Sequence, residues 1–286
     1  MALKKGSRVG KYEITGRLGG FGVGEVYGAR DARLGREVAI KIIDPETEDL
    51  ALVESAMSRA VTLYHPNIGS ILEFNVGGEL TYAVLEYYEG ESLRQRFGRG
   101  RLPLRDCAMI GSDIALGLAA AHERGIAHGS LTPASVLVGF DGRLKILDFG
   151  MVATESSAAL DANIEADCWA LGKMLYEGAT GELLDDGASD QLVHEVRLGL
   201  DRVGAPEAFT QVVVQCLPLG SKDERSAREI ALELRSLLTR SEAMMTTIPT
   251  IRTYPIGRVG VILFVIAILL GIVLGFVFGG DGPSAP

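Results

Sequence analysis

Four short segments hold residues that could bind phosphate or act in catalysis. Leu18–Tyr27 reads LGGFGVGEVY, a glycine-rich turn whose backbone N–H groups can approach phosphate oxygens. Lys41 ends the strand-like run VAIK, where a buried ammonium needs a partner. His128 lies in a predicted loop, and the triplet Asp148–Gly150 follows a predicted strand. Each feature alone has an ordinary structural explanation, but their order and spacing together are not incidental.

The pattern of apolar residues around these segments predicts strands first and helices later. Alternating and β-branched runs predict strands at 12–18, 24–29, 37–43, 71–75 and 81–86. Helical patterns occur at 49–63, 105–123, 165–178, 205–217 and 226–238. A hairpin is expected within 135–149, with its turn at Asp141-Gly142. A strand-rich part followed by a helix-rich part indicates an α+β layout in two lobes.

Over about residues 8–240 the chain resembles the eukaryotic-type (Hanks-type) serine/threonine protein kinases of bacteria. The similar segments are GEVYGARDARLGREVAIK (24–41), HPNI (65–68), LEYYEGESL (85–93), AHG (127–129), KILDFG (145–150), ADCWALGKMLYEGATG (166–181) and CLPLGSKDERSAREIALEL (216–234). The resemblance implies the protein-kinase-like two-lobe fold with ATP in the cleft. Its β-rich N-lobe would cover about residues 8–86 and its helical C-lobe about residues 91–240.

The resemblance also implies a nucleotide site, from which this sequence departs in places. The matching positions are Leu18, Gly19, Gly24, Val26, Ala39, Lys41, Glu86, Tyr88 and Asp148, the last as a ligand of one Mg²⁺. Phe21 stands where the family has the middle glycine of its loop. Ala56 stands where the family has the glutamate that orients Lys41, and Glu54 lies about 200° round the helix from it. The orienting ion pair is therefore expected to be absent or rebuilt, and binding of ATP and Mg²⁺ is left open.

The loop at His128 lacks the polar residues that act in catalysis in this family. Where the family reads HRDLKPxN, residues 128–135 read HGSLTPAS. The family's arginine, proton-accepting aspartate, γ-phosphate lysine and second-magnesium asparagine are replaced by Gly129, Ser130, Thr132 and Ser135. A serine has no accessible basic form at neutral pH, so Ser130 cannot serve as the base. No catalytic position is intact.

The segment between the DFG triplet and the next helix is also reduced. Asp167 matches the aspartate that braces the catalytic loop in the family, and it follows Asp148 by only 19 positions. The family has a much longer segment ending in an APE triplet, which this sequence lacks. Arg225 matches the arginine that would pair with the glutamate of that triplet. Few residues therefore remain in this segment that could bind a peptide substrate. The shortened segment contains the hydroxyls of Thr154, Ser156 and Ser157, which are either phosphorylation sites or simply solvated.

Composition narrows the class of protein further. Hydrophobic residues make up 47% of the chain and charged residues 23%, which is typical of a packed domain and excludes general disorder. A net charge of −9 disfavours nucleic acid as a partner. The cysteines are widely spaced and form no CxxC pair, which excludes a disulfide framework and a thiolate zinc site. Three buried, reduced thiols are expected at Cys107, Cys168 and Cys216.

The carboxyl-terminal region predicts a single membrane span. Val259–Phe278 holds twenty residues without a charge, enough for a helix of about 30 Å. A core helix is seldom apolar all round over this length. Residues 241–258 are expected to form a juxtamembrane linker, and residues 279–286 a short external tail. Arg252 and Arg258 precede the span, so the kinase-like domain should face the cytoplasm. The GxxxG spacing of Gly271 and Gly275 would allow a homodimer.

Three functions follow from these features. The first is a membrane-anchored pseudokinase that acts as a scaffold or allosteric regulator in signalling. Its expected partners are other signalling proteins, such as an active kinase or a phosphopeptide-binding module. The second is an active serine/threonine kinase with unusual residues, which Lys41 and Asp148 favour. The third is a nucleotide sensor, in which ATP binds without turnover and changes the affinity for a partner.

Overall fold

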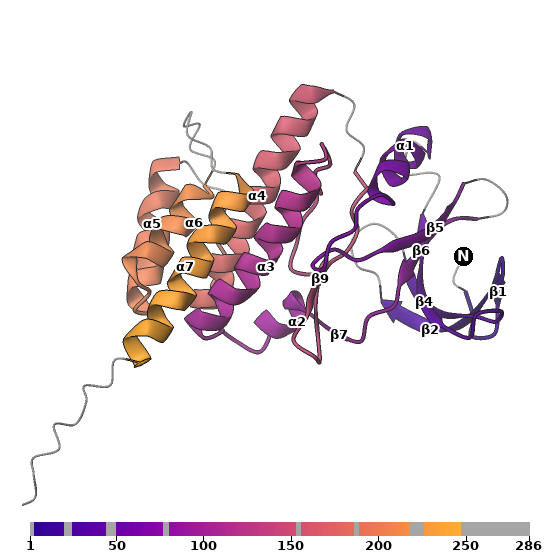
Figure 1. Cartoon of the computed structure of the whole chain (residues 1–286), viewed down its shortest axis with the longest axis horizontal. Helices are drawn as coiled ribbons and strands as arrows, with labels where there is room; N and C mark the ends of the chain where they lie inside the picture. Colours follow the sequence, from indigo (N-terminus) through magenta and orange to yellow (C-terminus); the bar gives the residue numbers. More distant parts are fainter. Residues whose placement is uncertain are drawn as a thin grey trace, which may run out of the picture. The chain divides into compact units, whose positions relative to one another are not determined.

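The computed structural model describes residues 3–19, 25–43, 50–76, 80–152, 156–185, 189–217 and 226–246. The chain divides into two compact units, Met1–Arg240 and Ser241–Pro286. Within the first unit, strands come first along the chain and helices later, as the sequence predicts (Figure 1). The first unit therefore holds every element that could position the predicted site.

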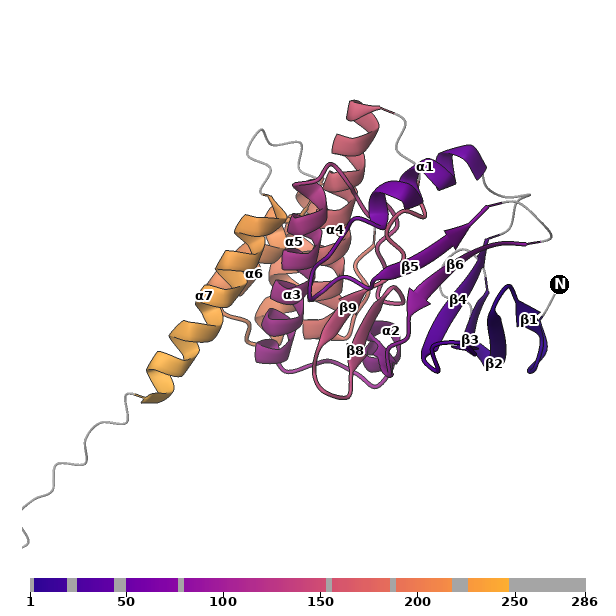
Figure 2. The same ribbon diagram turned by 45° about the vertical axis from the view of Figure 1, so that its right-hand side comes forward.

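The amino-terminal part of this unit is one antiparallel sheet with a single helix. Its strands lie in the order β1-β2-β3-β4-β6-β5. Their bounds are Arg8–Val9 (β1), Tyr12–Gly19 (β2), Val26–Asp31 (β3), Glu37–Ile43 (β4), Ile71–Asn75 (β5) and Thr81–Glu86 (β6). Helix α1 spans Leu50–Ala60 and lies beside β5 (Figure 2). The strands predicted at 37–43, 71–75 and 81–86 agree with β4, β5 and β6.

Strand β4 is buried on both faces, and this decides where its lysine points. Successive side chains of a strand face opposite sides of the sheet. Val38 and Ile40 pack in one apolar cluster with Tyr12 and Tyr27. Ala39 and Ile43 belong to a second cluster, which contains Val53 and Met57 of α1 and also Met151. Lys41 has the same parity as Ala39 and Ile43, so the strand directs it to the face of the sheet that carries α1.

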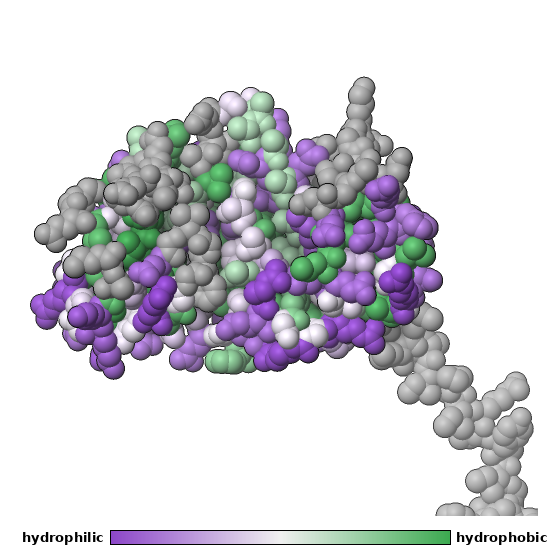
Figure 3. All heavy atoms as spheres, turned by 180° about the vertical axis from the view of Figure 1, so that it is seen from behind, coloured by the Kyte–Doolittle hydropathy of each residue, from purple (hydrophilic) through white to green (hydrophobic). Residues whose placement is uncertain are grey.

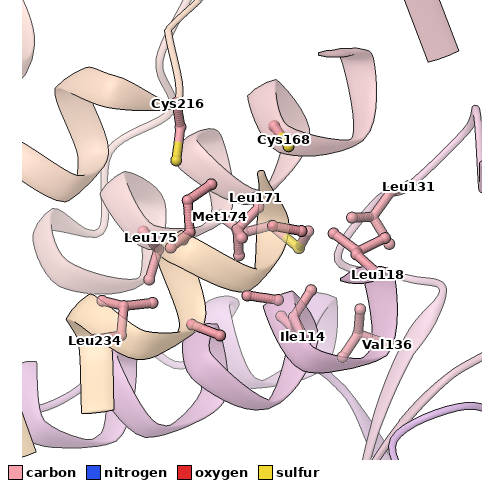
Figure 4. Close-up of a cluster of buried hydrophobic side chains, with 14 of the residues drawn as sticks. Ile114, Leu118, Leu131, Val136, Cys168, Leu171, Met174, Leu175, Cys216 and Leu234 are labelled. Carbon is pink, nitrogen blue, oxygen red and sulfur yellow. The ribbon is translucent and has the colours of Figure 1, made fainter. Parts of the chain in front are cut away.

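The carboxyl-terminal part consists of six helices and a three-stranded sheet among the described residues. The helices are Leu93–Phe97 (α2), Leu104–His122 (α3), Ser157–Thr180 (α4), Ser189–Arg202 (α5), Glu207–Gln215 (α6) and Ala227–Thr246 (α7). Strands Gly90–Ser92 (β7), Val136–Gly139 (β8) and Leu144–Ile146 (β9) form the small sheet. Figure 4 shows the core between the helices, where Leu118, Leu171 and Leu234 come together with Cys168 and Cys216.

Local signals in the sequence account for several of these bounds. The hydroxyl of Ser156 accepts a hydrogen bond from the Ala159 N–H at the start of α4, and Gly181 ends the helix with a φ of 78°. The predicted hairpin is β8 and β9, whose turn contains Gly142 at a φ of 79°. All three cysteines are buried and free, as expected from the sequence.

Three helical regions differ from the sequence-based prediction. Helix α4 begins at Ser157, two turns before the predicted start at residue 165, because Ser156 caps it there. Helix α7 continues to Thr246, so the first residues of the predicted linker are helical. Helix α5 was not predicted at all, because its buried positions Leu192, Val196 and Leu200 are separated by mainly polar residues.

The length and hydropathy of the described helices bear on whether any of them could span a membrane. None of the helices in the described ranges is both long and apolar enough to cross a membrane, and the predicted span Val259–Phe278 lies outside those ranges. On the face seen in Figure 3, hydrophilic residues line the lower edge and hydrophobic residues are scattered between them.

Candidate functional site

Lys41 is held between neighbouring strands and forms a buried ion pair with Asp148. In the ladder it lies opposite Val26 of β3 and Ala83 of β6. Its side chain is 1% exposed, and Nζ donates a hydrogen bond to Oδ1 of Asp148 at 2.7 Å. Because both groups are largely removed from water, the pairing stabilises the charge of each. The structure thus brings together two residues that the sequence predicts for nucleotide binding.

The triplet Asp148–Gly150 forms a strained turn after β9. Asp148 has a φ of 70° and is the one non-glycine residue with positive φ in the described part of the chain. Such a conformation costs about 1–3 kcal/mol and persists where the surroundings enforce it. Phe149 is buried, and its ring meets that of His128 edge-on at 4.9 Å between centroids. The turn leaves the Asp148 carboxylate 10% exposed, in contact with Lys41.

Helix α1 packs directly on this turn. A Cβ atom at Gly150 would lie 2.7 Å from Cβ of Ala60 and 3.1 Å from Sδ of Met57, so only glycine fits. Ala56 is buried on the same helix, and Glu54 is exposed. No carboxylate of α1 is therefore presented to Lys41 at the position where the resemblance implies one. Lys41 pairs with Asp148 of the DFG turn.

Asp167 of α4 braces the loop that carries His128. Its buried carboxylate accepts hydrogen bonds from the backbone N–H groups of His128 at 2.7 Å and Gly129 at 2.8 Å. His122 Nε2 lies 2.9 Å from the same carboxylate. The other anchor of the loop is the His128 ring, whose Nε2 lies 2.8 Å from the Leu147 carbonyl oxygen. These contacts fix the loop next to the Asp148 turn.

The side chains of this loop are polar, but their chemistry is limited. Ser130 and Thr132 are exposed. Ser135 is 5% exposed, and its hydroxyl donates to the Thr132 carbonyl at 2.8 Å while accepting from the Thr132 N–H at 3.1 Å. The hydroxyl of Ser135 is thus used within the loop, where the family has an asparagine directed at a metal. The described loop presents no carboxylate and no ammonium.

Gly129 shows why the family's arginine is missing. Its φ of 72° favours glycine, and an added Cβ would lie 3.0 Å from Cγ1 of Val152 and 3.4 Å from Cγ of Asn163. Val152 follows the DFG triplet, and Asn163 lies on the early part of α4. Side chains from these two segments therefore fill the space beside Gly129. A longer side chain there would have to displace them.

The connection from the triplet to α4 is very short. Gly150 and the helix cap Ser156 are six positions apart. Ser156 and Ser157 are exposed, and the Ser156 hydroxyl serves as the cap. Thr154 and Arg225, two further residues singled out in the sequence, lie outside the described residues. No peptide-binding segment precedes α4 within the described residues, because the helix itself begins where such a segment would run.

The remaining predicted nucleotide positions lie on the sheet and on the segment after β6. Val26 and Ala39 are buried in the cluster that contains Met151, on the lysine side of the sheet. Leu18 is partly exposed on β2, next to Gly19 at the end of that strand. Gly24 lies outside the described residues, as does Phe21.

Glu86 and Tyr88 direct their side chains elsewhere. The Tyr88 hydroxyl donates a hydrogen bond to the Glu86 carboxylate, and both residues line a hollow with Lys145 and Phe140. The Lys145 ammonium lies 4.8 Å from the centroid of the Tyr88 ring. Burial raises the pKa of the Tyr88 hydroxyl, and Glu86 adds to the effect; burial lowers the pKa of Lys145. The side chains of Glu86 and Tyr88 are thus engaged with each other in this hollow.

A cation at this site would have few protein ligands. In the described part of the chain, no three His, Cys, Asp or Glu side chains are grouped to hold a metal ion. Asp148 supplies the one candidate carboxylate, and one of its oxygens is already bonded to Lys41. The Ser135 hydroxyl is engaged within its own loop. The residues present thus fit a single Mg²⁺ bound through Asp148 and a ligand's own phosphates, but not a second one.

Sequence reasoning missed two features of this site. It placed Lys41 and Asp148 at one site but did not predict that they pair directly. It also missed that Val152 and Asn163 pack on Gly129. A local signal for the second existed in Ser156, a good helix cap followed by the helix-forming run Ser157–Leu160. The first depends on a contact between residues 107 positions apart, which no local pattern contains.

Together these features define a class of protein. The protein kinase fold consists of a curled antiparallel sheet with one helix and a second, helical lobe. Its site has a strand lysine paired with the acid of a DFG turn, and an aspartate that braces the loop of His128. The chain belongs to the protein kinase family: residues 12–163 match the family described as "Protein kinase domain". The match ends within α4, just before Asp167.

Individual relatives agree with this assignment. Serine/threonine-protein kinase PrkC of Bacillus subtilis is 31% identical over 211 residues, which cover 64% of this chain and 33% of that protein. Serine/threonine-protein kinase PknA of Mycobacterium tuberculosis is 30% identical over 212 residues, covering 63% of this chain and 49% of that protein. The chain thus spans less than half the length of either relative. The kinase domain of Mycobacterium tuberculosis PknI shares the fold, with a TM-score of 0.68, 22% identity, and coverage of 82% of this chain and 99% of that one.

Proposed function

We propose that this chain is a membrane-anchored pseudokinase, which acts as a scaffold or allosteric regulator in signalling and does not transfer phosphate. The observation that carries the proposal is Ser130, an exposed hydroxyl where the family has its proton-accepting carboxylate. A hydroxyl cannot take a proton from an incoming alcohol at neutral pH. The packing of Val152 and Asn163 on Gly129 supports the same conclusion, because it leaves no space for the family's arginine.

A phosphoryl-transfer assay on the purified full-length chain tests this proposal. Radiolabelled ATP, Mg²⁺ and a general protein substrate are supplied to the detergent-solubilised chain and to the Lys41→Met variant. We expect the same background incorporation from both proteins, because the catalytic base is missing from both. The two proteins differ only in the charge that would hold the phosphates. Magnesium-dependent transfer by the unaltered chain that Lys41→Met abolishes would overturn the proposal.

The alternative is an active serine/threonine kinase with atypical residues. It is supported by the relatives PrkC and PknA, which are serine/threonine-protein kinases. It is also supported by the retained pair of Lys41 and Asp148, since positioning and charge supply most of phosphoryl transfer. In this case the threonines at 246, 247 and 250 are the expected sites of autophosphorylation. Phosphate on these threonines, found by mass spectrometry after incubation with ATP, would favour the alternative.

We also propose residual nucleotide binding at the pair of Lys41 and Asp148. Lys41 would meet the phosphates, and Asp148 would hold one Mg²⁺, which would neutralise part of the phosphate charge. Thermal unfolding with millimolar ATP, with and without Mg²⁺, separates a nucleotide sensor from a pure scaffold. An increase in Tm that Lys41→Met removes supports binding. An unchanged Tm at every ATP concentration eliminates the sensor.

The anchoring part of the proposal rests on the sequence. Val259–Phe278 would cross the cell membrane once and leave the kinase-like domain in the cytoplasm, because Arg252 and Arg258 precede the span. Gly271 and Gly275 would allow two copies to pair through this helix. The proposed partners are other signalling proteins, among them an active kinase or a phosphopeptide-binding module. Crosslinking that is unaffected by leucine at both glycines would remove the dimer.

A further inference from the structure

A hollow beside helix α5 lies away from the residues of the kinase site. It has a volume of about 470 Å³ and opens to the surface. Its lining residues come from the end of α4, the second residue after it and one face of α5; they are Tyr176, Glu182, Gln191, His194, Glu195, Leu198 and Arg202. The positions on α5 follow a spacing of three and four residues, so they share one side of the helix. Helix α5 thus presents a continuous polar face to this hollow.

Tyr176 lies at the inner side of the hollow and is held there closely. It is 2% exposed, and its hydroxyl rests against the backbone of α5 at Gly199. A Cβ atom at Gly199 would lie 2.2 Å from the Tyr176 hydroxyl oxygen, so α5 requires glycine at this position. Within the described residues the hydroxyl makes no hydrogen bond with any other group. Because Tyr176 lines the hollow, its hydroxyl is available for a hydrogen bond with a ligand or with water there.

Two carboxylates line the same hollow as this hydroxyl. Burial raises the pKa of the Tyr176 hydroxyl, and the negative charges of Glu182 and Glu195 raise it further, whereas Arg202 acts in the opposite direction. Within the described residues neither glutamate forms an ion pair, although the neighbouring Arg197 pairs with Glu207 at 2.8 Å. Arg202 lies seven residues after Glu195, about 10 Å further along the helix axis. The negative end of the hollow is therefore the end that holds Glu182 and Glu195.

We propose that this hollow is the docking site for a protein segment that inserts an arginine or lysine side chain between Glu182 and Glu195. The charged head would be neutralised by the two carboxylates and would donate a hydrogen bond to the Tyr176 hydroxyl oxygen. Leu198 is 44% exposed on the same face and would cover the aliphatic part of the inserted side chain. Charge complementarity favours this occupant, since two exposed carboxylates, of Glu182 and Glu195, line the hollow. The inference rests on the proposed role of the chain in binding signalling partners.

Selection from peptide pools tests the docking site. Full-length chain in detergent is immobilised and exposed to nonapeptides with random flanks and a central arginine, or with citrulline, its neutral isostere, at the centre. We expect the arginine pool to be retained about tenfold better, which corresponds to a difference of about 1.4 kcal/mol. Glu195→Lys should abolish this preference, and Tyr176→Phe should reduce it. Asp201→Lys is the matched control, because Asp201 is an exposed acid of α5 outside the hollow and its reversal changes the net charge equally.

Several outcomes would overturn the proposal. The first is equal retention of the two pools, and the second is equal retention by the unaltered chain and Glu195→Lys. The third is the same loss of the preference for arginine in Asp201→Lys, which would indicate attraction to the overall charge. Displacement of the peptides by equimolar spermidine would assign the hollow to small cations instead. Glu195 is exposed, so its substitution should leave the chain folded. The test therefore stays valid even if Tyr176→Phe is unstable. Because no phosphoryl transfer is measured, failure here is distinct from failure of the pseudokinase assignment.

Discussion

At the scale of single residues, the polar groups of the kinase site are satisfied within the chain itself. Lys41 bonds to Asp148, and the Ser135 hydroxyl bonds to the Thr132 backbone. Asp167 accepts from the loop that it braces. Buried polar groups that have found partners cost little and hold their surroundings in one arrangement. These residues thus have a structural role that needs no substrate.

The ion pair of Lys41 and Asp148 should therefore contribute to stability. Lys41→Met leaves a nearly buried carboxylate without its counter-charge, which should cost about 3 kcal/mol. The double variant Lys41→Met with Asp148→Asn removes both charges, and asparagine tolerates the positive φ of this position. We expect a lowered Tm for the single variant and partial recovery for the double one. A double variant less stable than the single one would show that the pair is not a coupled unit.

Restoring the missing catalytic groups should not restore phosphoryl transfer. In the triple variant Ser130→Asp, Thr132→Lys and Ser135→Asn, the family's base, lysine and asparagine return. The space beside Gly129 stays filled by Val152 and Asn163, and no peptide-binding segment is added. We expect incorporation from labelled ATP to stay at the level of Lys41→Met. A rise above that level would show that the side chains of the loop alone separate this chain from its active relatives.

At the scale of elements, α1 and α4 decide what the site can do. Helix α1 closes on the DFG turn through Ala60 and Met57, which leaves no room for a side chain at Gly150. Helix α4 begins at Ser157 and places Asn163 against the catalytic loop. Both contacts join segments that are distant in sequence. They pack α1 against the DFG turn and α4 against the loop of His128.

The packing of α1 on the DFG turn can be tested with a pair of glycines. Gly150 and Gly142 both have positive φ, of 81° and 79°, but only Gly150 has atoms within 4 Å of an added Cβ. Gly142→Ala should cost about 1 kcal/mol through backbone strain alone. Gly150→Ala should cost about 1–3 kcal/mol more, because the methyl group overlaps Ala60. Equal losses in unfolding free energy would mean that α1 yields freely at this contact.

The sequence predicted the elements better than it predicted their contacts. Strands β4 to β6 were found at their observed bounds because β-branched and apolar residues fill them. Helix α5 was missed because Leu192, Val196 and Leu200, which recur at every fourth position, stand among polar residues and next to Gly199. That glycine is needed for the approach of Tyr176, a contact between two helices that no local pattern reveals. The direct pairing of Lys41 with Asp148 escaped prediction for the same reason.

At the scale of the whole molecule, charge and hydropathy are divided between the parts of the chain. Residues 1–240 carry the net charge of −9, and Val259–Phe278 carries none. An acidic domain is repelled by anionic lipid, so it cannot reach a membrane by surface charge. The proposed membrane association would therefore come from the apolar segment, and it should withstand both high salt and alkaline washing.

Charges placed in the apolar segment should release the chain from the membrane. Arginine at the centre of a span costs about 2.5–3.5 kcal/mol, so Ile266→Arg with Leu270→Arg removes most of the driving force for insertion. Ile266→Leu with Leu270→Ile is the matched control, because it keeps composition and length. After cell fractionation and a carbonate wash, we expect the control in the membrane pellet and the arginine variant in the supernatant. If the unaltered chain is itself extracted by carbonate, residues 259–278 do not span the bilayer, and partners would then be sought in solution.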